Sequence, residues 1–262
     1  MSRLGEPGLA VKKALWRQND PEAKGVPPVP PSTREKVLER DGYTCGHCGF
    51  RSLKWQEIHH KDDDHANNDL SNLVTLCPWC HGCHHVGFMG ASGKATLIWF
   101  PEMSQTGLFH LVRVLAVVLT QDRKGESGFR EVAHRIYEEL GRRRLPLDQA
   151  FGEGSHDPAI LGNILLSSED GAVREERLEG FRLLPLLNQW QPQVAYWSAS
   201  VFGSVPVGTW ARLAEKWAVD PDQKNSLIPE GDDSALSAHE KDPEEEMPES
   251  GSGMDRSGED EE

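Results

Sequence analysis

Residues 45–85 read CGHCGFRSLKWQEIHHKDDDHANNDLSNLVTLCPWCHGCHH and hold all five cysteines of the chain. Two Cys-x-x-Cys pairs, Cys45 with Cys48 and Cys77 with Cys80, lie near the two ends of this stretch. The short turn inside each pair points both sulfurs at a common centre, so four thiolates can bind one tetrahedral Zn²⁺. Four unrelated cysteines, buried as small apolar residues, are the alternative. Because four of the five cysteines fall into two such pairs, we predict a structural zinc site, with Cys83 as a packing residue or spare thiol.

The same stretch also carries a histidine, an asparagine and a histidine in this order, and it resembles the HNH, or ββα-metal, endonuclease motif. The resemblance implies that His60 is the general base that activates water and that Asn72 orients its imidazole. A neutral imidazole near its working pKa can take that proton. Both roles apply only if the chain is a nuclease.

The same motif implies a second metal ion, which would clamp a scissile phosphate. Its ligands would be His59, His81 and His85, with His84 as the competing ligand one residue away. The spacing supports the pairing of His81 with His85, since residues i and i+4 share one face of a helix.

The loop after His60 is acidic, which is the wrong charge for the entrance to a DNA-binding site. It reads Lys61-Asp62-Asp63-Asp64-His65 and continues to Asp69. DNA binding normally rests on lysine and arginine, which release counterions from the phosphates. A solvated turn is the simplest explanation of the aspartates; extra metal ligation and electrostatic exclusion of DNA are the alternatives.

Length and composition fit a zinc domain joined to a helical domain. The chain has 262 residues, of which 37% are hydrophobic, enough to bury a core. No apolar run reaches the length of a membrane span, and residues 1–6 lack the apolar core of a signal peptide. We therefore expect a cytoplasmic protein without membrane insertion, where paired cysteines serve as metal ligands rather than disulfides.

The net charge of −14 is concentrated at the C-terminus. Residues 230–262 hold 14 acidic and 2 basic side chains, which leaves a net charge of −2 for residues 1–229. This balance favours neither a general nucleic-acid binder nor a membrane-surface protein. The acidic tail has almost no apolar residues and is expected to be disordered.

The predicted fold class is α+β, with an HNH-like ββα zinc domain followed by an α-helical domain. The expected divisions are an extended Pro-rich arm, 1–31; the HNH-like zinc domain with its four cysteines, 32–100; the helical domain, 101–229; and the acidic tail, 230–262.

Local patterns predict the elements within these divisions. A capping box of Ser32 and Glu35 predicts the start of a helix, and Asp157 followed by Pro158 predicts the start of another. Strands are expected at 55–58, 73–76 and 95–100, helices at 102–119, 128–143, 158–166 and 169–181, a glycine-rich turn at 87–93, and weak helical segments carrying Trp190, Trp197, Trp210 and Trp217.

Five separated strings resemble the IcmJ/DotN family of type IVB, or Dot/Icm-type, secretion and conjugation systems. They are RDGYTCGHCGF at 40–50, NDLSNLVTLC at 68–77, TLIWFPE at 96–102, FGEGSHDPAI at 151–160 and RLLP at 182–185. The resemblance implies a part of a cytoplasmic coupling complex, gathered on a coupling ATPase at the inner membrane. It also implies an HNH-like zinc fold that does not cut DNA.

Two interpretations from different classes follow. The first is a non-enzymatic zinc protein that docks on the coupling ATPase of a type IVB system. The second is a metal-dependent HNH endonuclease that uses His60 as general base. The chain departs from the family pattern by keeping His59, His60, His81 and His85 and by adding the acidic tail, and this departure keeps the second interpretation open.

Overall fold

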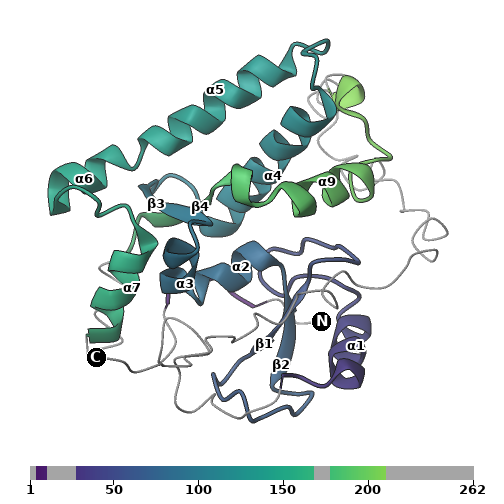
Figure 1. The fold of residues 1–262 in the computed structure, drawn as a ribbon. Coiled ribbons are helices and arrows are strands. Elements are labelled where there is room, and N and C mark those ends of the chain that lie inside the picture. The colour runs from purple at the N-terminus through teal and green to yellow at the C-terminus, as the bar shows by residue number, and fades with distance from the viewer. Residues whose placement is uncertain (1–3, 11–27, 168–177, 211–262) are drawn as a thin grey trace, which may run out of the picture. The chain divides into compact units, whose positions relative to one another are not determined.

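A computed structural model describes residues 4–10, 28–167 and 178–210, all within the compact unit Met1–Leu227. Figure 1 shows the order and arrangement of its elements. They are α1 (Pro31–Arg40), β1 (Glu57–His60), β2 (Leu73–Leu76), α2 (Pro78–Cys83), α3 (Val86–Ala91), β3 (Ala95–Trp99), α4 (Gln105–Gln121), α5 (Phe129–Arg142), α6 (Leu145–Phe151), α7 (Pro158–Ser167), β4 (Phe181–Pro185), the 3₁₀ turn η2 (Leu187–Gln189), α9 (Gln191–Ala199) and the 3₁₀ turn η3 (Val207–Thr209). The predicted α+β class is confirmed.

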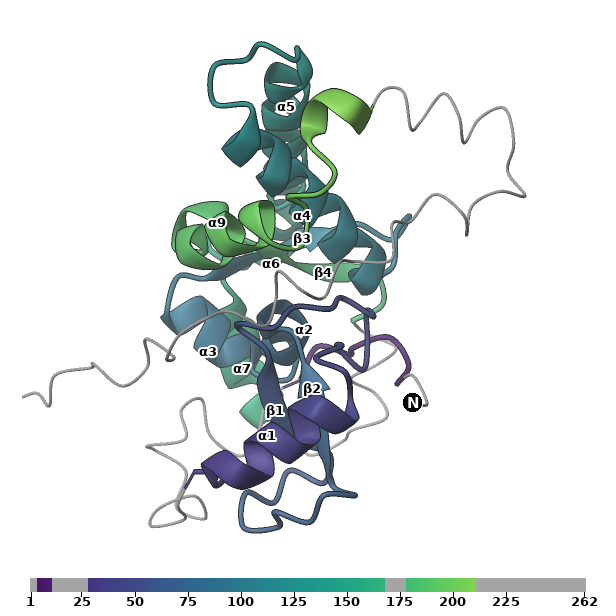
Figure 2. The same cartoon turned by 90° about the vertical axis from the view of Figure 1, so that its right-hand side faces the viewer.

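Strands β1 and β2 form an antiparallel pair that carries the histidine pair. Glu57 lies opposite Leu76 and His60 lies opposite Leu73. Helix α1 lies against this pair, as Figure 2 shows, and α2 begins directly after β2. All four residues of β2 are buried, so this strand holds the second Cys-x-x-Cys turn firmly against the core.

Strands β3 and β4 form a second antiparallel pair, which joins distant parts of the chain. Ala95 lies opposite Pro185 and Trp99 lies opposite Phe181. Strand β3 covers all but the last residue of the strand expected at 95–100, whereas β4 was not expected. The expected helix at 169–181 falls mostly outside the described residues, and its last residue begins β4 instead. The division at residue 100 stays a prediction.

Helix α4 is the central element of the core. Its buried side chains include Leu108, Val112 and Leu115, which are spaced as on one face of a helix. It packs against α5, α9 and β4. Trp79 of α2 meets Trp190 and Trp197 edge-on, so these three tryptophans pack within this chain. Burial of these large side chains removes much apolar surface from water and holds α2 beneath α9.

The start of the first helix and the turn expected at 87–93 both differ from the predictions. Helix α1 begins at Pro31, after the N-cap residue Pro30, and makes no side-chain cap bond, so the capping box of Ser32 and Glu35 does not form. Proline at the first helical position is already set for the helix and needs no N–H partner.

The expected glycine-rich turn at 87–93 contains helix α3 instead. Gly90 lies so close to α7 that a Cβ built on it would be 2.1 Å from the backbone nitrogen of Ala159. Gly90 therefore serves close helix packing rather than a turn.

Residues 4–10 of the predicted arm lie across the chain's own core. Leu4 N–H donates to Gly46 O at 2.9 Å, and Ala10 N–H donates to Cys83 O at 2.8 Å. The segment thereby contacts both the first Cys-x-x-Cys turn and the end of α2. The rest of the arm at 11–27, Trp217 and the acidic tail at 230–262 lie outside the described residues. Within the described residues, none of the helices combines the length and apolar character that crossing a bilayer requires.

Candidate metal centre

The four paired cysteines come together as predicted. Cys45 and Cys48 lie in a turn between Thr44 and Arg51, which form an isolated β-bridge. Cys77 and Cys80 open α2, where the Cys77 sulfur accepts a hydrogen bond from the Cys80 N–H at 3.5 Å. All four side chains are buried, and their sulfurs lie within 4.8 Å of one another. This cluster could hold a metal ion.

The crowding of the four sulfurs explains how a cation would stabilise the site. Hydrogen bonds from Cys45, Cys77 and Cys80, with a contribution from Arg113, lower the pKa of Cys48. Burial, together with hydrogen bonds from Cys45 and Cys48, raises the pKa of Cys77 well above its usual value. Four thiolates cannot coexist in so small a buried space without a cation, because their charges repel. A divalent metal ion would let all four sulfurs ionise.

Arg113 of α4 is the cation that faces these sulfurs. Its Nη2 lies 3.0 Å from the sulfur of Cys77. Burial lowers the pKa of Arg113, but the charges of Cys77 and the other cysteines outweigh this effect, so its pKa lies above the usual value. Sequence reasoning did not single out this residue. Its only signal was one arginine inside a run of buried apolar residues.

Three of the predicted metal-binding histidines also come together. The ring nitrogens of His59, His81 and His85 lie within 4.8 Å of one another, and the Nε2 atoms of His81 and His85 are 3.2 Å apart. His81 belongs to α2 and His85 precedes α3, so the i, i+4 spacing still brings the two rings together across the junction. This second cluster could also hold a metal ion.

Glu57 orients the ring of His81, which sequence reasoning did not foresee. The Nδ1 of His81 bonds to the Glu57 carboxylate, while its Nε2 faces His85. Burial raises the pKa of Glu57, but the hydrogen bond and charge of His81 reverse this effect, and its pKa lies below the usual value. Metal-binding histidines typically bond a carboxylate through the second ring nitrogen in this way.

His84 makes other contacts. Its Nε2 is 3.0 Å from the Nε2 of His47, whose Nδ1 bonds to the carbonyl oxygen of Gly5 at 2.6 Å. A ring nitrogen facing a carbonyl carries the proton, so the other nitrogen of a neutral His47 accepts from His84. His84 lies outside the histidine cluster that could hold a metal. Cys83 likewise lies outside the cysteine cluster, and its thiol faces the carbonyl of Trp79.

His60 is the last residue of β1, whereas Asn72 lies at the end of the following loop, directly before β2. His60 is buried, and its Nε2 lies 3.1 Å from the side-chain oxygen of Asn68. Its ring meets His65, whereas the ring of His59 meets His81, because neighbouring residues of a strand face opposite sides.

The amide of Asn72 is engaged with the acidic loop. It donates to Asp62 at 2.8 Å and to the carbonyl of Asn67 at 2.9 Å. Asn72 therefore shapes this loop, whereas the His60 ring bonds to Asn68. Desolvation raises the pKa of Asp62, but its hydrogen bonds with Asn67, Asn72 and nearby backbone together outweigh this effect, and the pKa lies below the usual value.

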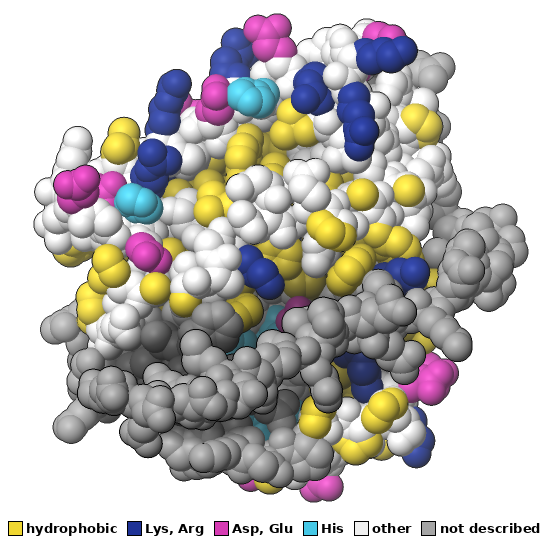
Figure 3. Space-filling model, viewed as in Figure 1, with side chains coloured by type: hydrophobic (Ala, Val, Ile, Leu, Met, Phe, Trp, Pro, Cys, Tyr) yellow, Lys and Arg dark blue, Asp and Glu magenta, His cyan; other side chains and the backbone are white. Residues whose placement is uncertain are grey.

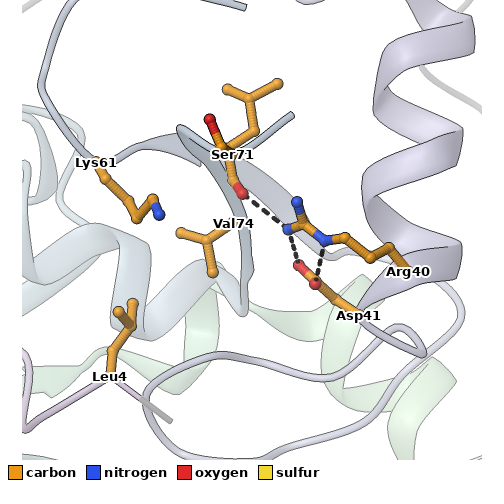
Figure 4. A pocket seen from close by; sticks show the side chains of 7 residues that line it. Leu4, Arg40, Asp41, Lys61, Ser71 and Val74 are labelled. Carbon is orange, nitrogen blue, oxygen red and sulfur yellow. Dashed lines mark hydrogen bonds and ion pairs between the residues drawn. The ribbon is translucent and has the colours of Figure 1, made fainter. Parts of the chain in front are cut away.

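A shallow hollow of about 330 Å³ lies beside this loop and is shown in Figure 4. Lys61 points into it, and Arg40 lies on its wall with both Nε and Nη2 bonded to Asp41. The Asp41 carboxylate also accepts from the N–H of Thr75 at 2.9 Å. Asp41 neutralises Arg40 and fastens α1 to β2, so the hollow does not form a strongly basic track.

The fold and the two clusters define an α+β protein able to hold metal ions at a four-cysteine and a three-histidine site. The chain is 36% identical over 178 residues to the "Type 4 apparatus protein DotN" of Legionella pneumophila subsp. pneumophila (strain Philadelphia 1). The match covers 66% of this chain and 81% of the Legionella protein. No family model matches the chain. On this similarity, the chain belongs to the DotN (IcmJ) family.

Proposed function

We propose that the chain is a non-enzymatic, zinc-binding component of a type IVB secretion or conjugation apparatus. The similarity to DotN, described as a type 4 apparatus protein, is the observation that carries this proposal. The proposed place of action is the cytoplasmic side of the inner membrane, where the chain would dock on the coupling ATPase.

The cysteine geometry supports zinc as the metal. Two sulfurs bound to one tetrahedral Zn²⁺ at about 2.3 Å lie about 3.8 Å apart. The sulfurs of Cys48 and Cys77 are 3.7 Å apart. Four thiolates in a closed, buried site are typical of structural zinc, which holds a small domain together without chemistry of its own.

The helical part offers a surface for a partner. A hollow of about 420 Å³ lies between α4, α5 and α9. Figure 3 shows apolar side chains in this region with basic side chains above them along α5. Its apolar lining comes from Ala116, Leu119, Leu187 and Val194, and its rim carries Arg123, Arg130 and His134. A segment of the coupling ATPase with apolar side chains and acidic neighbours would fit this surface.

Two measurements on the purified chain test the proposal. Metal analysis should find one tightly bound zinc per chain, lost when Cys77 is replaced by alanine. Co-purification should recover the coupling ATPase with the wild type but not with Leu119→Arg, which puts a charge into the hollow. Gly141→Arg, in α5 at a position where an added Cβ meets no atom within 4 Å, is the matched control. Absence of zinc would contradict the zinc-binding role. Recovery of the coupling ATPase with Leu119→Arg would contradict the docking surface.

The histidine cluster supports a second candidate function, a metal-dependent HNH endonuclease. The proximity of His59, His81 and His85 supports a second divalent metal there, and His60 and Asn72 would be the catalytic pair. Two features weigh against it: the aspartates beside His60, and the bond that ties the His60 ring to Asn68. Plasmid cleavage should be tested with Mg²⁺, Mn²⁺, Ni²⁺ and Zn²⁺ in turn. Cleavage that disappears in His60→Ala, with zinc retained, would establish the nuclease.

A further inference from the structure

Arg113 is a buried cation in the middle of α4. The residue is 1% exposed, and arginine is almost never fully buried unless it is paired. Among the residues that the structure describes, no carboxylate forms an ion pair with it. Its Nε and Nη1 atoms are buried without a hydrogen-bond partner in that same part of the chain. A buried charge of this kind needs an anion nearby.

The four-cysteine site is placed to supply that anion. Nη2 of Arg113 lies 3.0 Å from the sulfur of Cys77 and 3.8 Å from that of Cys48. The guanidinium carbon lies 4.0 Å from the centre of the Phe50 ring and 4.8 Å from that of Trp79. These aromatic faces hold the cation in place and keep it away from water.

A second side chain of α4 reaches the same cysteine turn. His110 is three residues before Arg113 and therefore lies on the same face of the helix. Its Nε2 donates to the carbonyl oxygen of Cys48 at 2.9 Å. Helix α4 thus presents both a cation and a hydrogen-bond donor to the first Cys-x-x-Cys turn.

The charge of the site changes with its metal content. A divalent ion bound by four thiolates leaves two net negative charges, and the single positive charge of Arg113 offsets one of them. Without a metal the four sulfurs cannot all ionise, because their charges repel, so the same guanidinium faces less negative charge than in the loaded form.

We propose that Arg113 is the counter-ion of the metal-loaded four-cysteine site and couples metal binding to the packing of α4 on the two Cys-x-x-Cys turns. This inference rests on the metal site of the proposed function. Arg113 is a positioning residue here: it stabilises the loaded form more than the metal-free form. Its contribution to stability therefore depends on metal content.

Thermal unfolding of Arg113→Met tests this dependence, because methionine keeps much of the apolar volume and removes the charge. The melting temperature should fall further below that of wild type in zinc-loaded protein than in protein stripped with a chelator. Val117→Ala is the control: Val117 is buried on the same helix, and its truncation should lower the melting temperature of both forms. An equal fall in both forms for Arg113→Met would show ordinary packing and overturn the proposal.

Cobalt binding gives a second test that does not need a folded metal-free protein. Titration with Co²⁺ against a competing chelator, followed by the thiolate-to-cobalt absorption band, should show roughly 10–100-fold weaker binding for Arg113→Met. Arg113→Lys, which keeps the charge but loses the planar group that lies over the aromatic rings, should bind Co²⁺ more tightly than Arg113→Met and less tightly than wild type.

Failure of the counter-ion role and failure of the metal site would give different results. Wild-type affinity in Arg113→Met, or a loss no larger than that of Val117→Ala, would overturn the counter-ion role alone. A wild-type chain that binds no Co²⁺ or Zn²⁺ would overturn the proposed metal site itself.

Discussion

The carboxylate of Glu6 accepts a hydrogen bond from the backbone N–H of Thr106 at 3.0 Å, across 100 residues of sequence. Thr106 lies in the first turn of α4, whose N–H groups have no partner within the helix. Ser104 accepts from Gly107 in the same turn. The N-terminal segment therefore completes the cap of the central helix while it also contacts the first Cys-x-x-Cys turn.

Glu6→Gln should lower the free energy of unfolding at pH 7 by roughly 0.3–1 kcal/mol, the usual value of an exposed anion at a helix N-terminus. Burial raises the pKa of Glu6, but hydrogen bonds from Thr106 outweigh this effect, and the pKa lies below 4.5 in the folded protein. A lowered folded pKa gives stability that is present above the unfolded pKa and lost as the pH falls through the folded value. Denaturation at several pH values should show the difference between the two proteins shrinking below pH 4.5. A difference that stays constant as the pH falls well below that value would contradict the role of the carboxylate charge.

Cys77→Ala should abolish tight zinc binding and cooperative unfolding of the β1–β2 part of the chain. The reason is that the folding of small zinc domains can rest on roughly 10–16 kcal/mol of metal binding. Zinc content and circular dichroism of the purified protein measure both effects.

Cys83→Ala is the matched control for Cys77→Ala. Cys83 is equally buried and three residues from Cys80, but lies outside the cluster. It should keep its zinc and lose about 1 kcal/mol of stability, as for a small loss of buried volume. Equal zinc loss in the two variants would contradict the assignment of the four ligands.

Features that depend on short spacing could be predicted from the sequence. The Cys-x-x-Cys turns, the approach of His81 and His85, and the apolar stripe of α4 need only local geometry. The start of α7 belongs to this group, since the Asp157 side chain accepts from the N–H of Ala159 at 2.8 Å, as an N-cap does.

Features that depend on distant neighbours could not be predicted. Strand β4 is short and pairs with β3 from far along the chain, so its local pattern does not identify its partner. In the sequence Arg113 is a single arginine in an apolar helix, and only the fold brings it next to Cys77. Glu57 is one acidic residue of a strand until α2 brings His81 within reach. These contacts are set by packing and leave no periodic signal.

Glu57→Gln should weaken metal binding at the histidine cluster by roughly 10–100-fold, because the carboxylate that orients His81 and raises its basicity is lost. Ni²⁺ or Co²⁺ titration of protein whose cysteine site is already filled with zinc measures this. His134→Ala is the control, since that histidine is exposed on α5 and pairs with Glu138. Wild-type protein that binds only one metal ion per chain would rule out the second site.

Two glycine substitutions distinguish close helix packing from open helix surface. A Cβ on Gly90 would lie 2.1 Å from the nitrogen of Ala159 and 2.5 Å from the Asp157 carboxylate, so α3 and α7 would have to separate. Gly90→Ala should therefore lower the free energy of unfolding by roughly 1–3 kcal/mol, the usual cost of overpacking.

The same change at Gly141, within α5, meets no atom within 4 Å. Gly141→Ala should raise the free energy of unfolding by about 0.4–1 kcal/mol, because alanine restricts the unfolded chain and favours the helix. Urea denaturation of both variants in the same buffer measures the two changes in the free energy of unfolding. Because the chemical change is identical, opposite signs would isolate the effect of the α3–α7 contact. A Gly90→Ala protein as stable as wild type would mean that these helices do not pack as closely as the backbone distances require.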